Sequence, residues 1–209
     1  MELKNKIFII QNLIRSENFS TAIVNCKKLL KKYPENSYTH NLCGLALQGE
    51  KRFSNSIEYF SKALHYDPEN LAAMNNLANS YKTLYYYDKA QDLYLKIIKK
   101  DPLNLKTLNN YANLKRTWND FDGAIDLYLK ATKINPEEIN ILFSLADSYQ
   151  SIGDFKKSRE VIDRILRIDP NKTSAHKLIS GFTNYHEGNK EHLDTMKNLS
   201  SKSDLTDNQ

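Results

Sequence analysis

The stretch LNNYANLKRTWNDFDGAIDLYLKA, residues 108–131, decides the fold because its pattern recurs along the chain. Its first six residues, LNNYAN at 108–113, return as MNNLAN at 74–79 after a shift of 34 positions. The prolines keep the same interval of 34 and are Pro34, Pro68, Pro102, Pro136 and Pro170. A fixed period of about 20–50 residues indicates stacked supersecondary units, none of which buries its apolar face alone.

Each period reads as two helices joined by a short turn. In the third period Met74, Leu77, Ala78 and Tyr81 fall at i, i+3, i+4 and i+7, which places them on one helix face. Aromatic residues mark the start of each second helix at the same interval of 34, at Phe19, Phe53, Tyr87, Phe121 and Phe155. The second helix must end before each proline, because the residue that precedes proline is displaced from the α region.

Polar residues at the helix starts predict the N-caps. We expect asparagine to cap successive first helices, at Asn36, Asn70 and Asn104. For the second helices, the residues placed to accept the first amides are Ser20, Ser54, Asp88 and Asp122.

A helix-turn-helix of 34 residues, with small residues at its eighth and twentieth positions and proline at its thirty-second, resembles the tetratricopeptide repeat family. The resemblance implies an all-α fold: a right-handed α-solenoid of about six helix-turn-helix units without strands. Residues 1–172 would hold five repeats, followed by a divergent sixth repeat or capping helix pair at 173–200, with Gly188 at its turn, and a polar tail at 201–209. The predicted repeats are 3–36, 37–70, 71–104, 105–138 and 139–172.

The resemblance also implies where a ligand would bind. In this family the first helices line a concave groove, with positions 2, 5, 6, 9, 12 and 13 pointing inward. Residues 108–131 look like repeats of the O-linked N-acetylglucosamine transferase array, whose asparagine ladder contacts bound peptide. A carboxamide can both donate to and accept from a peptide bond, so such a ladder would hold a peptide backbone. The ladder candidates are Asn41, Asn75, Asn76, Asn79, Asn109, Asn110 and Asn113.

The other inward positions suggest an apolar and slightly acidic ligand. Lys106 and Arg116 add positive charge to the predicted groove, and Phe143 with Asp147 mixes apolar and acidic character. The alternative is that the asparagines are solvated helix residues, enriched by a bias of the genome.

Bulk composition excludes several classes of protein. The net charge of +5 is modest, so we expect no nucleic-acid partner. No apolar run approaches the ~18 residues of a membrane span, and MELKNKIFII lacks a secretory cleavage site. The two cysteines, Cys26 and Cys43, fit a reducing compartment, so a cytoplasmic location is predicted. We expect no cofactor or metal, although His186 and His192 lie close enough in sequence to share one.

These patterns leave three functions open. The first is a non-enzymatic scaffold that holds an extended peptide or a partner helix in the groove. The second is the N-terminal recognition region of a larger transferase, either a glycosyltransferase or a sulfotransferase, because related arrays precede such domains. The third is self-association through the C-terminal helix pair, where Leu193, Met196 and Leu199 form a short apolar stripe.

Overall fold

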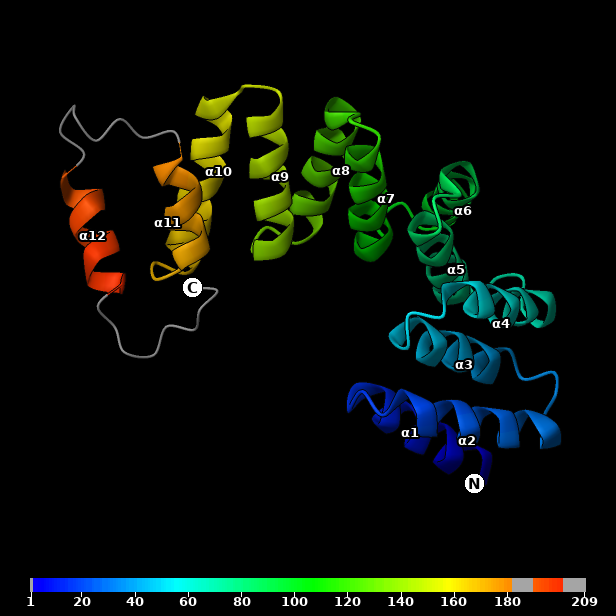
Figure 1. The fold of residues 1–209 in the computed structure, drawn as a ribbon. Coiled ribbons are helices and arrows are strands. Elements are labelled where there is room, and N and C mark those ends of the chain that lie inside the picture. The colour runs from blue at the N-terminus through cyan, green and yellow to red at the C-terminus, as the bar shows by residue number, and fades with distance from the viewer. Residues whose placement is uncertain (1, 182–189, 201–209) are drawn as a thin grey trace. The chain divides into compact units, whose positions relative to one another are not determined.

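The computed structural model describes residues 2–181 and 190–200, and every regular element in these ranges is an α-helix (Figure 1). The chain divides into two compact units, Met1–Asn110 and Tyr111–Gln209, with the boundary inside α7 (Leu105–Thr117). The predicted all-α fold of helical hairpins is therefore confirmed for the described residues. The predicted turn at Gly188 and the predicted tail at 201–209 lie outside them.

Unit 1 consists of three antiparallel hairpins and the first half of α7. Each first helix from α3 onward begins 34 residues after the previous one, as the sequence period requires. The three hairpins are α1 (Glu2–Arg15) with α2 (Phe19–Lys32), α3 (Ser37–Gly49) with α4 (Phe53–Tyr66), and α5 (Leu71–Thr83) with α6 (Tyr87–Lys100).

Unit 2 continues the same alternation of first and second helices. The second half of α7 is followed by α8 (Phe121–Ile134), α9 (Ile139–Ser151), α10 (Phe155–Ile168), α11 (Thr173–Ser180) and α12 (Lys190–Ser200). Each second helix from α2 to α10 ends two residues before its proline, with an intervening residue near φ −130° to −143°. This extended residue is the expected consequence of the following proline ring.

The turn between the two helices of each hairpin has one residue in the left-handed region. The five equivalent positions, each 34 residues after the last, are Glu17, Lys51, Tyr85, Asn119 and Gly153, with φ between 58° and 79°. Glycine adopts this conformation without strain, whereas a bulky side chain there is unusual. This turn therefore stores strain in four of the five hairpins.

Small residues let the helix backbones approach, as the sequence predicted. Ala78 and Ala90 in unit 1, and Ala112 and Ala124 in unit 2, are fully buried. The first two hairpins share an apolar core around Ile10, Leu29 and Leu47. Cys26 and Cys43 lie in this core as free, buried cysteines.

The predicted N-caps are right for first helices and wrong for second helices. The side chains of Asn36, Asn70 and Asn104 accept from the backbone N–H three residues later, at 2.8, 2.9 and 3.0 Å. The second helices begin two residues earlier than the predicted caps require. Asp120 and Asp154 cap α8 and α10, and the residues at the N-cap of α2, α4 and α6 make no side-chain cap. Ser20, Ser54, Asp88 and Asp122 are therefore first-turn residues and not caps.

Replacing Asp120 with alanine is expected to cost about 1 kcal/mol of stability. The Asp120 carboxylate accepts from the Gly123 N–H at 3.0 Å, and Lys115 lies 2.8 Å from it. These two contacts, with Lys115 first, lower the pKa of Asp120. Stability from this group should thus be present at neutral pH and be lost as the pH falls toward the lowered pKa.

Urea denaturation measures this effect, and Asp122→Ala is the matched control. Asp122 is exposed in the same first turn of α8 and is not the N-cap residue. Its replacement should change stability by less than about 0.5 kcal/mol. Equal losses in both variants would contradict the assignment of the cap to Asp120.

Candidate functional site

The asparagines of unit 1 connect one first helix to the next. Asn76 on α5 donates from Nδ2 to Oδ1 of Asn41 on α3 at 3.0 Å. Asn110 on α7 donates in the same way to Asn75 on α5, also at 3.0 Å. Each bond spans 35 residues, so it joins the sixth position of one predicted repeat to the fifth position of the repeat before. Asn41, Asn75 and Asn76 are only 4 %, 3 % and 3 % exposed.

Two further asparagines bond within their own hairpin. Asn79 accepts from the Tyr94 hydroxyl at 2.6 Å, and Asn113 accepts from the Tyr128 hydroxyl at 2.7 Å. Both pairs are separated by 15 residues, and both tyrosines are fully buried. Burial raises the pKa of Tyr94 and of Tyr128, so both phenols stay protonated donors at neutral pH.

These contacts use much of the hydrogen-bonding capacity that a bound peptide would need. The buried Nδ2 of Asn75 has no hydrogen-bond partner within the described structure. Asn79, Asn109, Asn110 and Asn113 are half-buried, and Lys106 is exposed. The pattern in the sequence did not reveal that Asn41, Asn75 and Asn76 are covered. Peptide binding by the asparagines remains a prediction.

An open pocket of about 580 Å³ lies in unit 2 between α7, α9 and α11. It brings together three of the predicted site residues, Arg116, Phe143 and Asp147. The residues of this unit 2 pocket are completed by Ser144, Gln150, Ser174, Lys177, Leu178 and Gly181.

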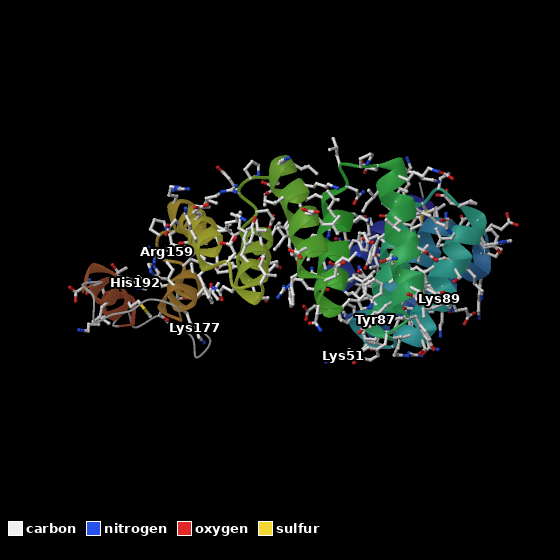
Figure 2. The ribbon with its side chains drawn as sticks, turned by 90° about the horizontal axis from the view of Figure 1, so that it is seen from above. Lys51, Tyr87, Lys89, Arg159, Lys177 and His192 are labelled. Atoms are coloured by element: carbon white, nitrogen blue, oxygen red, sulfur yellow. The ribbon has the colours of Figure 1, made fainter. Side chains whose placement is uncertain are left out.

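The unit 2 pocket combines an apolar wall with a surplus of hydrogen-bond donors. Phe143 and Leu178 are half-buried, and Lys177 is exposed (Figure 2). Arg116 pairs through Nη2 with the Asp147 carboxylate. The buried Nε of Arg116 and Nε2 of Gln150 have no partner among the described residues. Two cations and one carboxylate leave the lining positively charged, which suits a ligand with an apolar group beside an acidic or carbonyl acceptor.

Six lining residues of the unit 2 pocket were missed from the sequence. All nine lining residues fall at positions 2, 5, 6, 9 or 12 of repeats that begin at 105, 139 and 173. The missed residues of α11 therefore follow the predicted register, although residues 173–206 lack the closing proline. Extending the 34-residue frame into α11 would have identified Ser174, Lys177 and Leu178.

Histidine and cysteine side chains serve packing in the described structure. His40 and His176 face the carbonyl oxygens of Pro34 and Pro170 through Nε2, at 2.7 and 3.0 Å. His192 on α12 stacks on His176 at 5.3 Å, and burial with nearby His176 and Arg159 lowers its pKa (Figure 2). His186, the second residue of the proposed metal pair, lies outside the described residues. Within the described ranges, no three His, Cys, Asp or Glu side chains are placed to hold a metal ion.

The C-terminal stripe is described only in part. Leu193 is exposed and Met196 is half-buried, while the side chain of Leu199 lies outside the described residues. Self-association through this stripe remains a prediction. Among the described helices, none is long and apolar enough to cross a membrane.

Comparison with known families and structures supports the repeat reading of the sequence. Residues 5–113 match a model described as the N-terminal TPR repeats region of Psidin, which covers just over half of the chain. Residues 119–180 match a tetratricopeptide repeat model. The likeness to the O-linked N-acetylglucosamine transferase array remains a prediction. A search of curated protein sequences gave no match.

Solved structures share the fold at low sequence identity. PilF of Pseudomonas aeruginosa matches with a TM-score of 0.78 and 17 % identity, over 94 % of this chain and 88 % of that one. MamA of Desulfovibrio magneticus matches at 0.71 and 16 % identity, over 81 % and 96 %. A further MamA structure matches at 0.67 and 20 % identity, over 82 % and 94 %.

Proposed function

Since the chain belongs to the tetratricopeptide repeat family, we propose that it is a non-enzymatic scaffold that binds an extended peptide or a partner helix along its first helices. The observation that carries the proposal is the unit 2 pocket. Its lining joins Phe143, Arg116 and Lys177, and it comes entirely from the inward positions of successive first helices. The proposal requires no cofactor, and the two free cysteines suit a cytoplasmic location.

The unit 2 pocket would anchor one bulky side chain of the ligand beside a carboxylate. Phe143 and Leu178 provide the apolar contact, and Lys177 carries a charge that no ion pair within the described residues neutralises. A ligand carboxylate near Arg116 would compete with Asp147 for the guanidinium. The half-buried Asn109, Asn110 and Asn113 would contact the peptide backbone elsewhere on the first helices.

Peptides selected on the full chain from a random display library test the proposal. We expect the selected peptides to combine an acidic residue with a bulky apolar one. In fluorescence anisotropy, Lys177→Glu and Phe143→Ala should each weaken their binding about tenfold or more. The charge reversal Lys133→Glu on the exposed side of α8 is the matched control and should leave affinity unchanged. Selected peptides that bind both pocket variants like wild type would contradict binding in the unit 2 pocket.

A further inference from the structure

Four tyrosines and a lysine gather where α5 turns into α6 in unit 1. Tyr81 lies on α5, Tyr85 and Tyr86 form the turn, and Tyr87 with Lys89 begins α6 (Figure 2). We call these five residues the tyrosine surface. Tyr85 is 78 % exposed and Tyr86 is 53 % exposed. Large aromatic side chains that a fold leaves in water are typical of contact surfaces.

Tyr85 is not explained by the needs of its turn. It has φ 63°, and the equivalent residues Glu17, Lys51, Asn119 and Gly153 adopt the same left-handed conformation without an aromatic ring. A bulky side chain in this region carries strain of about 1 kcal/mol or more. The ring of Tyr85 therefore costs stability and gains little from burial. Such a residue is a candidate for recognition of a partner.

The rings are arranged in two perpendicular pairs. Tyr81 and Tyr86 lie 6.1 Å apart at 87°, and Tyr85 and Tyr87 lie 5.9 Å apart at 74°. Perpendicular aromatic rings form angled walls against which the flat ring of a proline packs. Surfaces of this kind recognise proline-containing segments in the polyproline II conformation, whose stiffness reduces the entropy lost on binding.

The charge of the tyrosine surface is positive. The Lys89 ammonium lies 5.5 and 5.2 Å from the ring centroids of Tyr81 and Tyr86. These rings fix its position but do not neutralise it, and no carboxylate of the described residues forms an ion pair with Lys89. Lys51 is exposed in the turn between α3 and α4, and Asp88 is the acidic residue in the first turn of α6. A partner with carboxylates beside its prolines would complement this charge.

We propose that the tyrosine surface is a docking site for an acidic, proline-containing segment of a partner protein. Prolines of the segment pack against the perpendicular tyrosine pairs, and a neighbouring carboxylate binds Lys89. This site lies in unit 1 and does not depend on the unit 2 pocket.

A short fluorescein-labelled peptide of alternating glutamate and proline is the probe, measured by fluorescence anisotropy with the full chain. We expect it to bind with an affinity that falls as salt rises, whereas the matched lysine–proline peptide does not bind. Tyr85→Gly should weaken binding about tenfold while leaving the fold at least as stable, because glycine suits the left-handed turn. Lys89→Gln should also weaken binding, and should reduce the salt dependence.

Glu17→Gly is the matched control, since it relieves the same backbone strain in another hairpin of unit 1 without removing an aromatic ring. It should raise stability like Tyr85→Gly and leave peptide binding unchanged. The proposal would be overturned if wild type fails to bind the glutamate–proline peptide at about 1 mM, or if Tyr85→Gly and Lys89→Gln both bind it like wild type. A short oligouridylate that binds in its place, with the same dependence on Tyr85, would also overturn it and assign the surface to single-stranded nucleic acid.

Discussion

Changing Asn76 to aspartate is expected to destabilise unit 1 by about 3 kcal/mol near pH 7. Asn76 donates to the Asn41 carbonyl oxygen at 3.0 Å, and both side chains are almost fully buried. An ionised carboxylate has the same shape as the amide but no N–H. The substitution would therefore bury a charge and set two acceptor oxygens against each other.

The loss should depend on pH with a defined sign. Burial and the facing oxygen of Asn41 raise the pKa of the introduced carboxyl group in the folded state above the ordinary value of about 3.9. The folded state then binds more protons than the unfolded state, so the variant loses stability as the pH rises. Below about pH 4 the protonated acid can donate to Asn41, and the variant should approach wild type. Urea denaturation of both proteins across this range measures the difference.

Asn79→Asp is the control one turn later in the same helix. The Asn79 side chain accepts from the Tyr94 hydroxyl at 2.6 Å, and a carboxylate accepts from a hydroxyl equally well. Its cost should stay below about 1 kcal/mol near neutral pH. The structural role of the Asn76 donor would be refuted by equal losses in the two variants, or by a loss in Asn76→Asp that does not change with pH.

The recurrence of asparagine in residues 74–79 and 108–113 was predictable, but its cause was not recognised. Asn79 and Asn113 recur because tyrosine recurs 15 residues later, at Tyr94 and Tyr128. Hairpins with an apolar residue at the tyrosine position carry no asparagine at the other: Leu45 with Phe60, and Asp147 with Ile162. This paired change was visible in the sequence and indicates an internal hydrogen bond.

Burial of the remaining asparagines could not be deduced from the repeat pattern. The pattern places Asn41, Asn75 and Asn76 on the face of each first helix that is turned away from its own second helix. Whether a neighbouring first helix covers that face depends on how closely the helices approach. The structure shows that Asn41 and Asn75 accept bonds from the following first helix, and a period alone does not specify that distance.

Part of the unit 2 pocket was predictable for a simple geometric reason. Arg116, Phe143 and Asp147 were placed by counting along the repeat, and the structure brings them to one pocket. Lys177 and Leu178 were missed because α11 belongs to a stretch without the usual proline and small residues. Those markers report packing between helices, whereas the pocket lies on another face of the same helices. Loss of the packing markers therefore says nothing about the lining positions.

Gly44→Ala is expected to destabilise unit 1 by about 2 kcal/mol, although alanine favours a helix over glycine by about 1 kcal/mol. A Cβ atom at Gly44 would lie 2.4 Å from Cε1 of the Phe60 ring, which is fully buried. The equivalent first-helix positions carry alanine at Ala78, Ala112 and Ala146. The glycine is therefore required by the ring that packs against it and not by the helix.

A double-mutant cycle separates the contact with the ring from helix propensity. Phe60→Leu alone should destabilise by leaving a cavity, but in the Gly44→Ala background it should cost less, because the shorter side chain makes room for the new methyl group. Gly181→Ala is the control, since its Cβ would meet only the Leu178 carbonyl oxygen at 3.4 Å. Urea denaturation of the four proteins and the control gives the coupling energy. Additive losses, or a Gly44→Ala variant as stable as wild type, would show that Phe60 does not limit the approach of α3 and α4.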